Sequence, residues 1–262
     1  MSKSGAEESQ GRKDIFHYLF NVTDDAGNPA YSAEELNAEA SLLITAGSDT
    51  TAMTLAGFFF HTLRSPRVYA KLVEEIRTTF KNVDDIQMGT ALSSCKYLQA
   101  CMEETMRAAP AGVSELPREV LPGGLEINGN YIPQGTHVGV STWSIMHNQE
   151  AFGDPWIFRP ERWIVDSVTG VTAEDVARAQ SAFNPFSIGI YNCAGQKLAM
   201  QELLLTAART LYRMDVRLAP GDTLGAGAPN LGWGLRDRNH MALQDAYLSL
   251  RTGPTVQFRK RT

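Results

Sequence analysis

The stretch from Ser32 to Pro66 constrains the fold more than any other part of the chain. Ser32 and Glu35 have the spacing of a capping box, which marks a helix start. No proline follows until Pro66, so we predict one helix of roughly thirty residues, about 45 Å long. A helix of that length crosses a whole domain, and the 262 residues suffice for one large domain or two small ones.

The same helix is apolar on nearly every face from Leu42 to Leu63, which predicts burial in a protein core. A membrane span is the alternative, because the apolar length suffices. That span would place Asp49 near the bilayer centre, at about 2.5–3.5 kcal/mol. It would also carry a series of hydroxyl side chains, namely Thr45, Ser48, Thr50, Thr51, Thr54 and Thr62.

The helix centre reads Ala46-Gly47-Ser48-Asp49-Thr50-Thr51. A glycine inside a helix costs about 1 kcal/mol relative to alanine, so we expect the missing side chain at Gly47 to serve a purpose. Asp49 and Thr50 set an acid and an alcohol beside that gap, a combination suited to proton delivery. A helix kink with a solvated Asp49 is the alternative interpretation.

A second feature is Cys193, which ends a turn-rich, partly aromatic loop and precedes a strongly helical segment. The positive end of a helix and its unpaired N–H groups favour the thiolate form of a cysteine placed there. Gly189 and Gly195 lack side chains, so a flat group can approach the backbone. Phe186 is expected to shield the sulfur from water. The pattern suits a soft, anionic metal ligand, and a buried structural cysteine is the alternative.

Phe186, Gly189, Cys193 and Gly195 match the heme-binding loop of the cytochrome P450 monooxygenases, which this segment resembles. The family usually has Arg or His where this chain has Tyr191. Further landmarks occur in family order. Residues 46–51 match the oxygen-binding helix, Glu-x-x-Arg is present as Glu104 and Arg107, and a Pro-Glu-Arg segment ends at Arg162. The resemblance implies that Glu104, Arg107 and Arg162 form a buried charge network that holds the loop of Cys193.

A β-rich stretch lies between these landmarks. Asn128-Gly129 is a hairpin signal, and residues 136–141 alternate as a strand. Arg118 precedes this sheet, where the family commonly has an Arg that pairs with a heme propionate; an ordinary exposed Arg is the alternative. We further expect helices over 14–22, 66–80, 97–109 and 198–212, a loop over 220–234 and a terminal strand.

Composition excludes some classes of function. A net charge of -5 and a pI of about 5.6 argue against nucleic acid or anionic lipid as the main partner. The cysteines Cys95, Cys101 and Cys193 have no CxxC spacing, which argues against a zinc ribbon or a disulfide framework and favours reduced thiols inside a cell. The histidines, which are His17, His61, His137, His147 and His240, lack metal-ligand spacing and are interpreted as structural.

The resemblance covers about residue 14 to the end and implies a mainly α fold with a small β region, the C-terminal half of the P450 fold. Residues 1–13, polar and without a signal peptide, are expected to be a disordered lead-in. The implied cofactor is heme, with the Cys193 thiolate as axial ligand and Phe186, Gly189, Gly195 and Arg118 as further contacts. Ala46 and Gly47 would contact it from the oxygen-binding helix.

The implied activity is insertion of one oxygen atom from O₂ into an apolar organic substrate, with Asp49 and Thr50 relaying protons and an NADPH-dependent flavoprotein reductase supplying electrons. Full-length eukaryotic relatives sit at the endoplasmic reticulum membrane through an N-terminal segment. This chain is expected to lack that anchor, to be intracellular, and to be a fragment with little turnover alone. Two alternatives remain open: a non-catalytic heme-binding fragment, and a hydrolase with Cys193 as nucleophile, which needs a positioned His.

Overall fold

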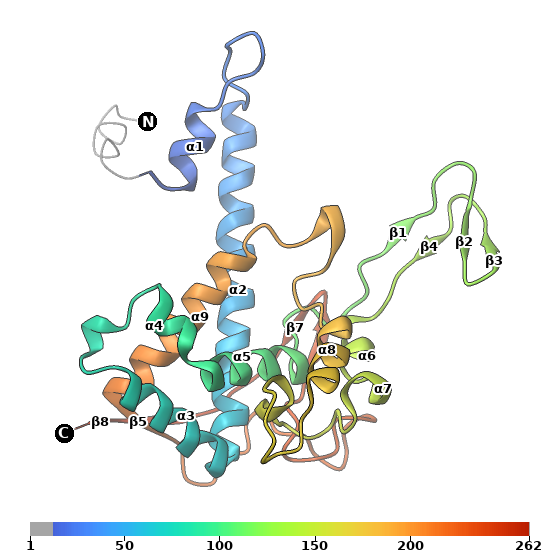
Figure 1. Cartoon of the computed structure of the whole chain (residues 1–262). Coiled ribbons are helices and arrows are strands. Elements are labelled where there is room, and N and C mark those ends of the chain that lie inside the picture. The colour runs from blue at the N-terminus through green and yellow to red at the C-terminus, as the bar shows by residue number, and fades with distance from the viewer. Residues whose placement is uncertain (1–12, 262) are drawn as a thin grey trace. The chain divides into compact units, whose positions relative to one another are not determined.

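The computed structural model describes residues 13–261 (Figure 1). The chain divides into two compact units, Met1–Asp49 and Thr50–Thr262, and the division falls within α2. Residues 1–12, most of the predicted lead-in, lie outside the described part.

Helices dominate both units, and the strands form small two-stranded antiparallel sheets, so the predicted mainly α class is confirmed. The helices in residues 13–261 are α1 Ile15–Asn21, α2 Ala33–Arg64, α3 Pro66–Thr79, α4 Thr90–Ser94, α5 Lys96–Ala108, α6 Thr142–Met146, α7 Gln149–Phe152, α8 Ala173–Ala182 and α9 Gln196–Arg213. Short 3₁₀ helices are η2 Val83–Asp85, η3 Pro160–Trp163 and η4 Gly189–Tyr191. The strands are β1 Arg118–Glu119, β2 Leu125–Ile127, β3 Asn130–Ile132, β4 His137–Val138, β5 Met214–Leu218, β6 Gln244–Ala246, β7 Leu248–Leu250 and β8 Val256–Lys260.

The long helix forms as its capping box predicts. The N–H of Ser32 donates to Glu35 Oε2 at 2.7 Å, and the N–H of Glu35 donates to Ser32 Oγ at 3.2 Å. Two N–H groups that the first turn would otherwise leave unpaired are thereby satisfied. The helix runs for 32 residues and ends one residue before Ser65, which precedes Pro66 at the start of α3.

Burial of the whole apolar stretch of α2 is wrong. Leu42 is 60% exposed and Ile44 68% exposed. Buried side chains of α2 begin at Thr54 and include Phe58, Phe60, His61 and Thr62. A helix that is apolar on all faces needs neighbours on all faces, and the described residues supply them only over its C-terminal part. No helix in residues 13–261 has both the length and the hydropathy required to cross a membrane.

The core of the unit Thr50–Thr262 forms where α3, α5 and α9 pack against one another. Val68, Leu72 and Ile76 are the buried side of α3, and their spacing of four residues places them on one face of the helix. α5 is buried on almost every face, because it also contacts η3 and α6. It therefore carries Glu104 and Arg107 into the interior, where they need partners.

The Asn-Gly hairpin is confirmed. Asn128 has φ 50° and Gly129 φ 79°, the left-handed pair that a tight hairpin turn requires, and Ile127 pairs with Asn130 on either side of it. The predicted strand over 136–141 shortens to β4, because Ser141 instead caps α6 by accepting the N–H of Ser144 at 3.3 Å. The terminal strand β8 pairs with β5, and residues 220–234 form a loop without a named element.

Candidate functional site

The loop of Cys193 joins α8 to α9 and is closed by its own backbone. The N–H of Cys193 donates to the carbonyl of Phe186 at 2.9 Å, and the N–H of Gln196 donates to the carbonyl of Cys193 at 3.3 Å. Gly189 has φ 76°, a conformation in which glycine meets no steric penalty. Cys193 therefore lies at the start of α9, as its sequence position predicts.

The Cys193 thiol is free and exposed. We expected Phe186 to shield the sulfur from water, and for the described residues this expectation is wrong. The thiol is exposed, and Phe186 packs against the hydrophobic core. A Cβ added at Gly189 would meet no atom within 4 Å, and one at Gly195 would meet only the Cys193 Sγ, at 3.7 Å. An accessible sulfur donor beside open backbone fits a flat, metal-bearing group such as heme.

Arg118 lies against this loop. Its guanidinium carbon stands 4.9 Å from the centre of the Tyr191 ring, and its Nη1 donates to the carbonyls of Leu116 at 3.2 Å and Pro117 at 3.0 Å. A cation over an aromatic face is attracted by the ring quadrupole. Tyr191 is the residue that departs from the family pattern. Its ring attracts the positive charge of Arg118, which belongs to another segment, to the loop of Cys193.

The division between the two units falls in the centre of α2, between Asp49 and Thr50. Ala46, Gly47 and Asp49 are exposed, and a Cβ at Gly47 would meet nothing within 4 Å. The Thr54 hydroxyl donates to the Thr50 carbonyl at 2.8 Å, one turn along the helix. The proton-relay role of Asp49 and Thr50, and their placement across from Cys193, stay predictions.

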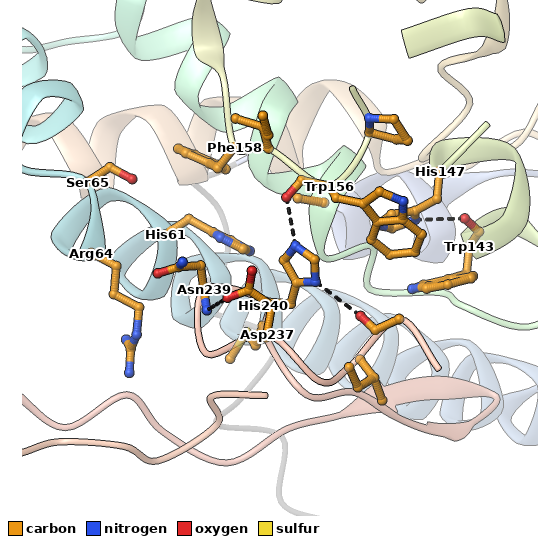
Figure 2. A pocket seen from close by; sticks show the side chains of 16 residues that line it. His61, Arg64, Ser65, Trp143, His147, Trp156, Phe158, Asp237, Asn239 and His240 are labelled. Carbon is orange, nitrogen blue, oxygen red and sulfur yellow. Dashed lines mark hydrogen bonds between the residues drawn. The ribbon is translucent and has the colours of Figure 1, made fainter. Parts of the chain in front are cut away.

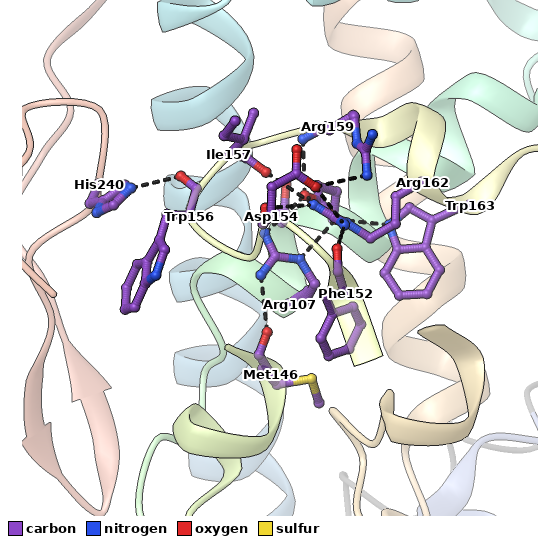
Figure 3. A network of polar contacts seen from close by, with 12 residues as sticks. Arg107, Met146, Phe152, Asp154, Trp156, Ile157, Arg159, Arg162, Trp163 and His240 are labelled. Atoms are coloured by element: carbon purple, nitrogen blue, oxygen red, sulfur yellow. Dashed lines mark hydrogen bonds and ion pairs between the residues drawn. The ribbon is translucent and has the colours of Figure 1, made fainter. Parts of the chain in front are cut away.

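The structure brings Glu104, Arg107 and Arg162 together in a buried cluster (Figure 3). Glu104, which is 0% exposed, accepts from Arg107 Nη2 and Nε, each at 2.9 Å, and from Arg162 Nε at 3.2 Å. Burial by itself raises the pKa of Glu104, but the two guanidinium groups outweigh it and hold that pKa below its ordinary value. Glu104 is therefore a buried, ionised acceptor.

The cluster ties α5 to the segment that follows α6. Arg107 Nη1 donates to the carbonyl of Met146 at 3.0 Å, and Arg162 donates to the carbonyls of Phe152, Asp154 and Ile157. Met146 and Phe152 end α6 and α7, where the last turn leaves carbonyls without helical partners, so the arginines satisfy them.

Trp163 connects this cluster to the loop of Cys193, and sequence reasoning missed it. Its Nε1–H donates to Glu104 Oε2 at 3.0 Å, and its ring packs on Phe183, the first residue of the loop, with centroids 4.6 Å apart. Its place directly after the Pro-Glu-Arg segment was the only signal for this role.

Glu161 forms a second buried site that sequence reasoning also missed. It accepts from Arg67 Nη1 at 2.7 Å and from the Tyr97 hydroxyl at 2.9 Å. Burial raises the pKa of Glu161, but the hydrogen bonds from Arg67 and Tyr97 exceed that effect and lower it to about 2. Burial, followed by the neighbouring Cys101 and Glu161, raises the pKa of Tyr97. The glutamate of the Pro-Glu-Arg segment thus links η3 to α3 and α5.

A metal site made of protein side chains and a cysteine nucleophile find less support. No three His, Cys, Asp or Glu side chains in residues 13–261 gather as a metal site. Within the same residues, the Cys193 Sγ makes no hydrogen bond to a histidine, and a cysteine nucleophile needs such a base. Cys95 and Cys101 are buried, and burial raises the pKa of each thiol, so neither is a reactive thiolate.

Comparison with known proteins agrees with this geometry. The family described as Cytochrome P450 matches residues 2–232. A cytochrome P450 monooxygenase of Gibberella zeae is 36% identical over 252 residues, which are 95% of this chain and 56% of that protein. The cytochrome P450 monooxygenase poxM of Penicillium oxalicum is 38% identical over 95% of this chain and 44% of its own length. Cytochrome P450 monooxygenase lcsN of Purpureocillium lilacinum is 33% identical over 100% of this chain and 75% of its own.

The chain spans about half the length of the first of these curated relatives. With a family match that covers most of its residues, a mainly helical fold and the cysteine loop ahead of α9, the chain belongs to the cytochrome P450 family.

Proposed function

We propose that this chain is the heme-binding portion of a monooxygenase that inserts one oxygen atom from O₂ into an apolar organic substrate. The observation that carries the proposal is the accessible Cys193 thiol at the start of α9, beside open backbone at Gly189. A bound heme with a thiolate ligand supplies the oxygen-activating chemistry, since the thiolate pushes electron density toward O–O cleavage.

The residues of this chain would bind and position the cofactor. Cys193, at the start of α9, would be the thiolate ligand of the heme iron. Phe186, Gly189 and Gly195 shape the loop around the sulfur. Arg118 is the proposed propionate partner, and its contact with Tyr191 keeps its charge at that loop.

In α2, Ala46 and Gly47 are the proposed heme contacts, and Asp49 and Thr50 the proposed proton carriers. An exposed carboxylate next to a hydroxyl on one helix exchanges protons with water readily, which is what the reaction requires of them. Glu104, Arg107 and Arg162 are positioning residues, and Trp163 transmits their order to the loop through Phe183.

The proposed partners are an apolar small molecule and an NADPH-dependent flavoprotein reductase. The exposed thiol leaves the proposed ligand open to water. We therefore expect the chain by itself to bind heme weakly and to turn over little, which is the behaviour of the alternative, a heme-binding fragment without catalysis.

The test is a carbon-monoxide difference spectrum of the reduced, heme-loaded chain. We expect a thiolate-type spectrum from the unsubstituted chain and its loss in Cys193→Ala. Cys95→Ala, which removes a buried thiol elsewhere, is the matched control and should keep the spectrum. A thiolate-type spectrum that survives Cys193→Ala contradicts the assignment of the ligand, and a stoichiometric one contradicts the expected weak binding.

A further inference from the structure

A cavity of about 320 Å³ lies within the unit Thr50–Thr262, and none of the described residues that line it is proposed above for heme or proton transfer (Figure 2). A water molecule occupies about 30 Å³ of the liquid, and ligand pockets begin near 300 Å³. The cavity is therefore of ligand size rather than a hole for one water.

His61 is the polar centre of this cavity. It is 4% exposed, and its Nε2 has no hydrogen-bond partner among the described residues. Its ring stacks on Phe158, with centroids 4.7 Å apart and planes 4° from parallel, and Figure 2 shows it pointing from α2 toward His240. Buried polar atoms are nearly always bonded, so the unpaired Nε2 indicates a partner in the cavity.

The walls of the cavity are aromatic. The rings of Trp143 and His147 stack at 4.4 Å, and Trp156 packs against both. His240 is already engaged, because its two ring nitrogens contact the carbonyls of Gly234 at 3.1 Å and Trp156 at 2.7 Å. Among these histidines, His61 is the one with an unpaired buried nitrogen, and a flat ring is the shape that the walls accommodate.

Unpaired hydrogen-bond donors at the cavity favour an anion. Arg64 also lines the cavity. Its Nη2 pairs with the carboxylate of Asp222 at 3.4 Å, but its Nη1, which can only donate, lacks a partner in the described residues. Arg251, close to His61, bonds only to neutral groups of residues 13–261, among them the carbonyls of Met53 at 2.9 Å and Pro110 at 3.0 Å. Burial lowers the pKa of His61 well below its usual value, and the nearby Arg107, Arg251, His240 and Arg64 lower it further.

One acidic side chain, Asp237, belongs to the lining. It is exposed to solvent, and its Oδ1 accepts the N–H of Asn239 at 2.8 Å. Its charge opposes an anion, but solvent screens it more than it screens the part-buried guanidinium of Arg251.

We propose that this cavity is a binding site for a small aromatic carboxylate, whose ring lies against Trp143 and Trp156 and whose carboxylate accepts a hydrogen bond from His61 Nε2–H. None of the described residues that line the cavity is one proposed above for heme. The carboxylate supplies the partner that His61 Nε2 lacks.

Calorimetric titration of the 262-residue chain with benzoate tests the proposal, and benzamide is the neutral analogue of the same shape. Because a hydrogen bond to a charged group is worth roughly 1.5–3 kcal/mol, benzoate should bind at least about tenfold more tightly than benzamide. His61→Phe, which keeps a stacking ring on Phe158, should remove that preference. His137→Phe, an exposed histidine outside the cavity, should keep it.

Charge variants give results of opposite sign. Arg64→Gln should weaken benzoate binding, and Asp237→Asn should strengthen it, while benzamide binding changes in neither. Equal affinity of the unsubstituted chain for benzoate and benzamide, or full benzoate affinity in His61→Phe, overturns the proposal.

Circular dichroism shows whether His61→Phe folds. If it does not fold, ¹⁵N spectra of the histidine rings in the unsubstituted chain test the proposal instead. Benzoate should move the His61 nitrogen signals and leave those of His137 in place, and unmoved His61 signals overturn the proposal. Neither heme nor turnover enters these measurements, so they stand apart from the test of the proposed function.

Discussion

At the scale of single residues, Glu104 shows how much one carboxylate can organise. It holds Arg107, Arg162 and the Trp163 indole, and it also accepts the N–H of Arg159 at 2.9 Å. Each partner comes with its own segment of chain, so the carboxylate fixes the irregular residues before the cysteine loop. Buried ions are costly unless they are paired, and this pairing makes the site sensitive to loss of one member.

Glu104→Gln should lower the free energy of unfolding by about 3–5 kcal/mol, because it leaves buried guanidinium groups without their counter-charge. Urea unfolding followed by circular dichroism measures the loss. Glu126→Gln, in the exposed strand β2, is the matched control and should stay within about 0.5 kcal/mol. A Glu104→Gln chain as stable as the control would show that the cluster contributes little net stability.

At the scale of elements, the β2–β3 hairpin depends on one backbone conformation. Gly129 has φ 79°, and a Cβ added there would meet nothing within 4 Å. A substitution at Gly129 therefore tests the conformational penalty without a steric clash.

Gly129→Ala should destabilise the hairpin by about 1–2 kcal/mol, the penalty of the left-handed conformation for a residue with a Cβ. Hydrogen exchange at the β2 and β3 amides should become faster, by roughly five- to thirtyfold. Gly232→Ala, where a Cβ also meets open space but φ is not left-handed, should leave exchange in the hairpin unchanged. Equal effects of the two substitutions would argue against the conformational explanation.

At the scale of the whole molecule, buried titratable groups make stability depend on pH. The folded state lowers the pKa of Glu161 to about 2, through Arg67 and Tyr97 acting against burial. It lowers the pKa of His147 to about 4, mainly by burial and secondly through Arg107. In both cases the unfolded chain binds more protons, so stability is present above the unfolded pKa and is lost as the pH falls. Burial raises the pKa of Glu103 to about 7. Glu103 therefore affects stability in the opposite direction, because the stability falls as the pH rises from the ordinary pKa of a glutamate to about 7.

The cost of Glu161→Gln should therefore be largest above about pH 4.5 and shrink toward pH 2, where the native glutamate also becomes protonated. Urea unfolding of the unsubstituted and variant chains across this range measures the difference. Glu126→Gln should show no such trend. A pH-independent cost of Glu161→Gln would mean that its carboxylate charge does not contribute to stability.

Local pattern was enough to predict several elements. The Ser32 and Glu35 pair, Pro66 at the first position of α3, and the Asn128-Gly129 turn each act through neighbouring backbone, so residues close in sequence suffice. The position of Cys193 before α9 followed in the same way.

Tertiary structure decided what depends on neighbours distant in the chain. Burial of α2 stops short of Leu42, because apolar pattern states a need for partners and not their presence. The thiol of Cys193 is exposed, because its position before a helix does not determine which side chains cover it. Trp163 bridging Glu104 and Phe183, and the cavity around His61, join residues dozens of positions apart. The sequence by itself thus determined the elements and the family motifs, and only packing decided which side chains meet, since long-range contacts are set by the fold as a whole.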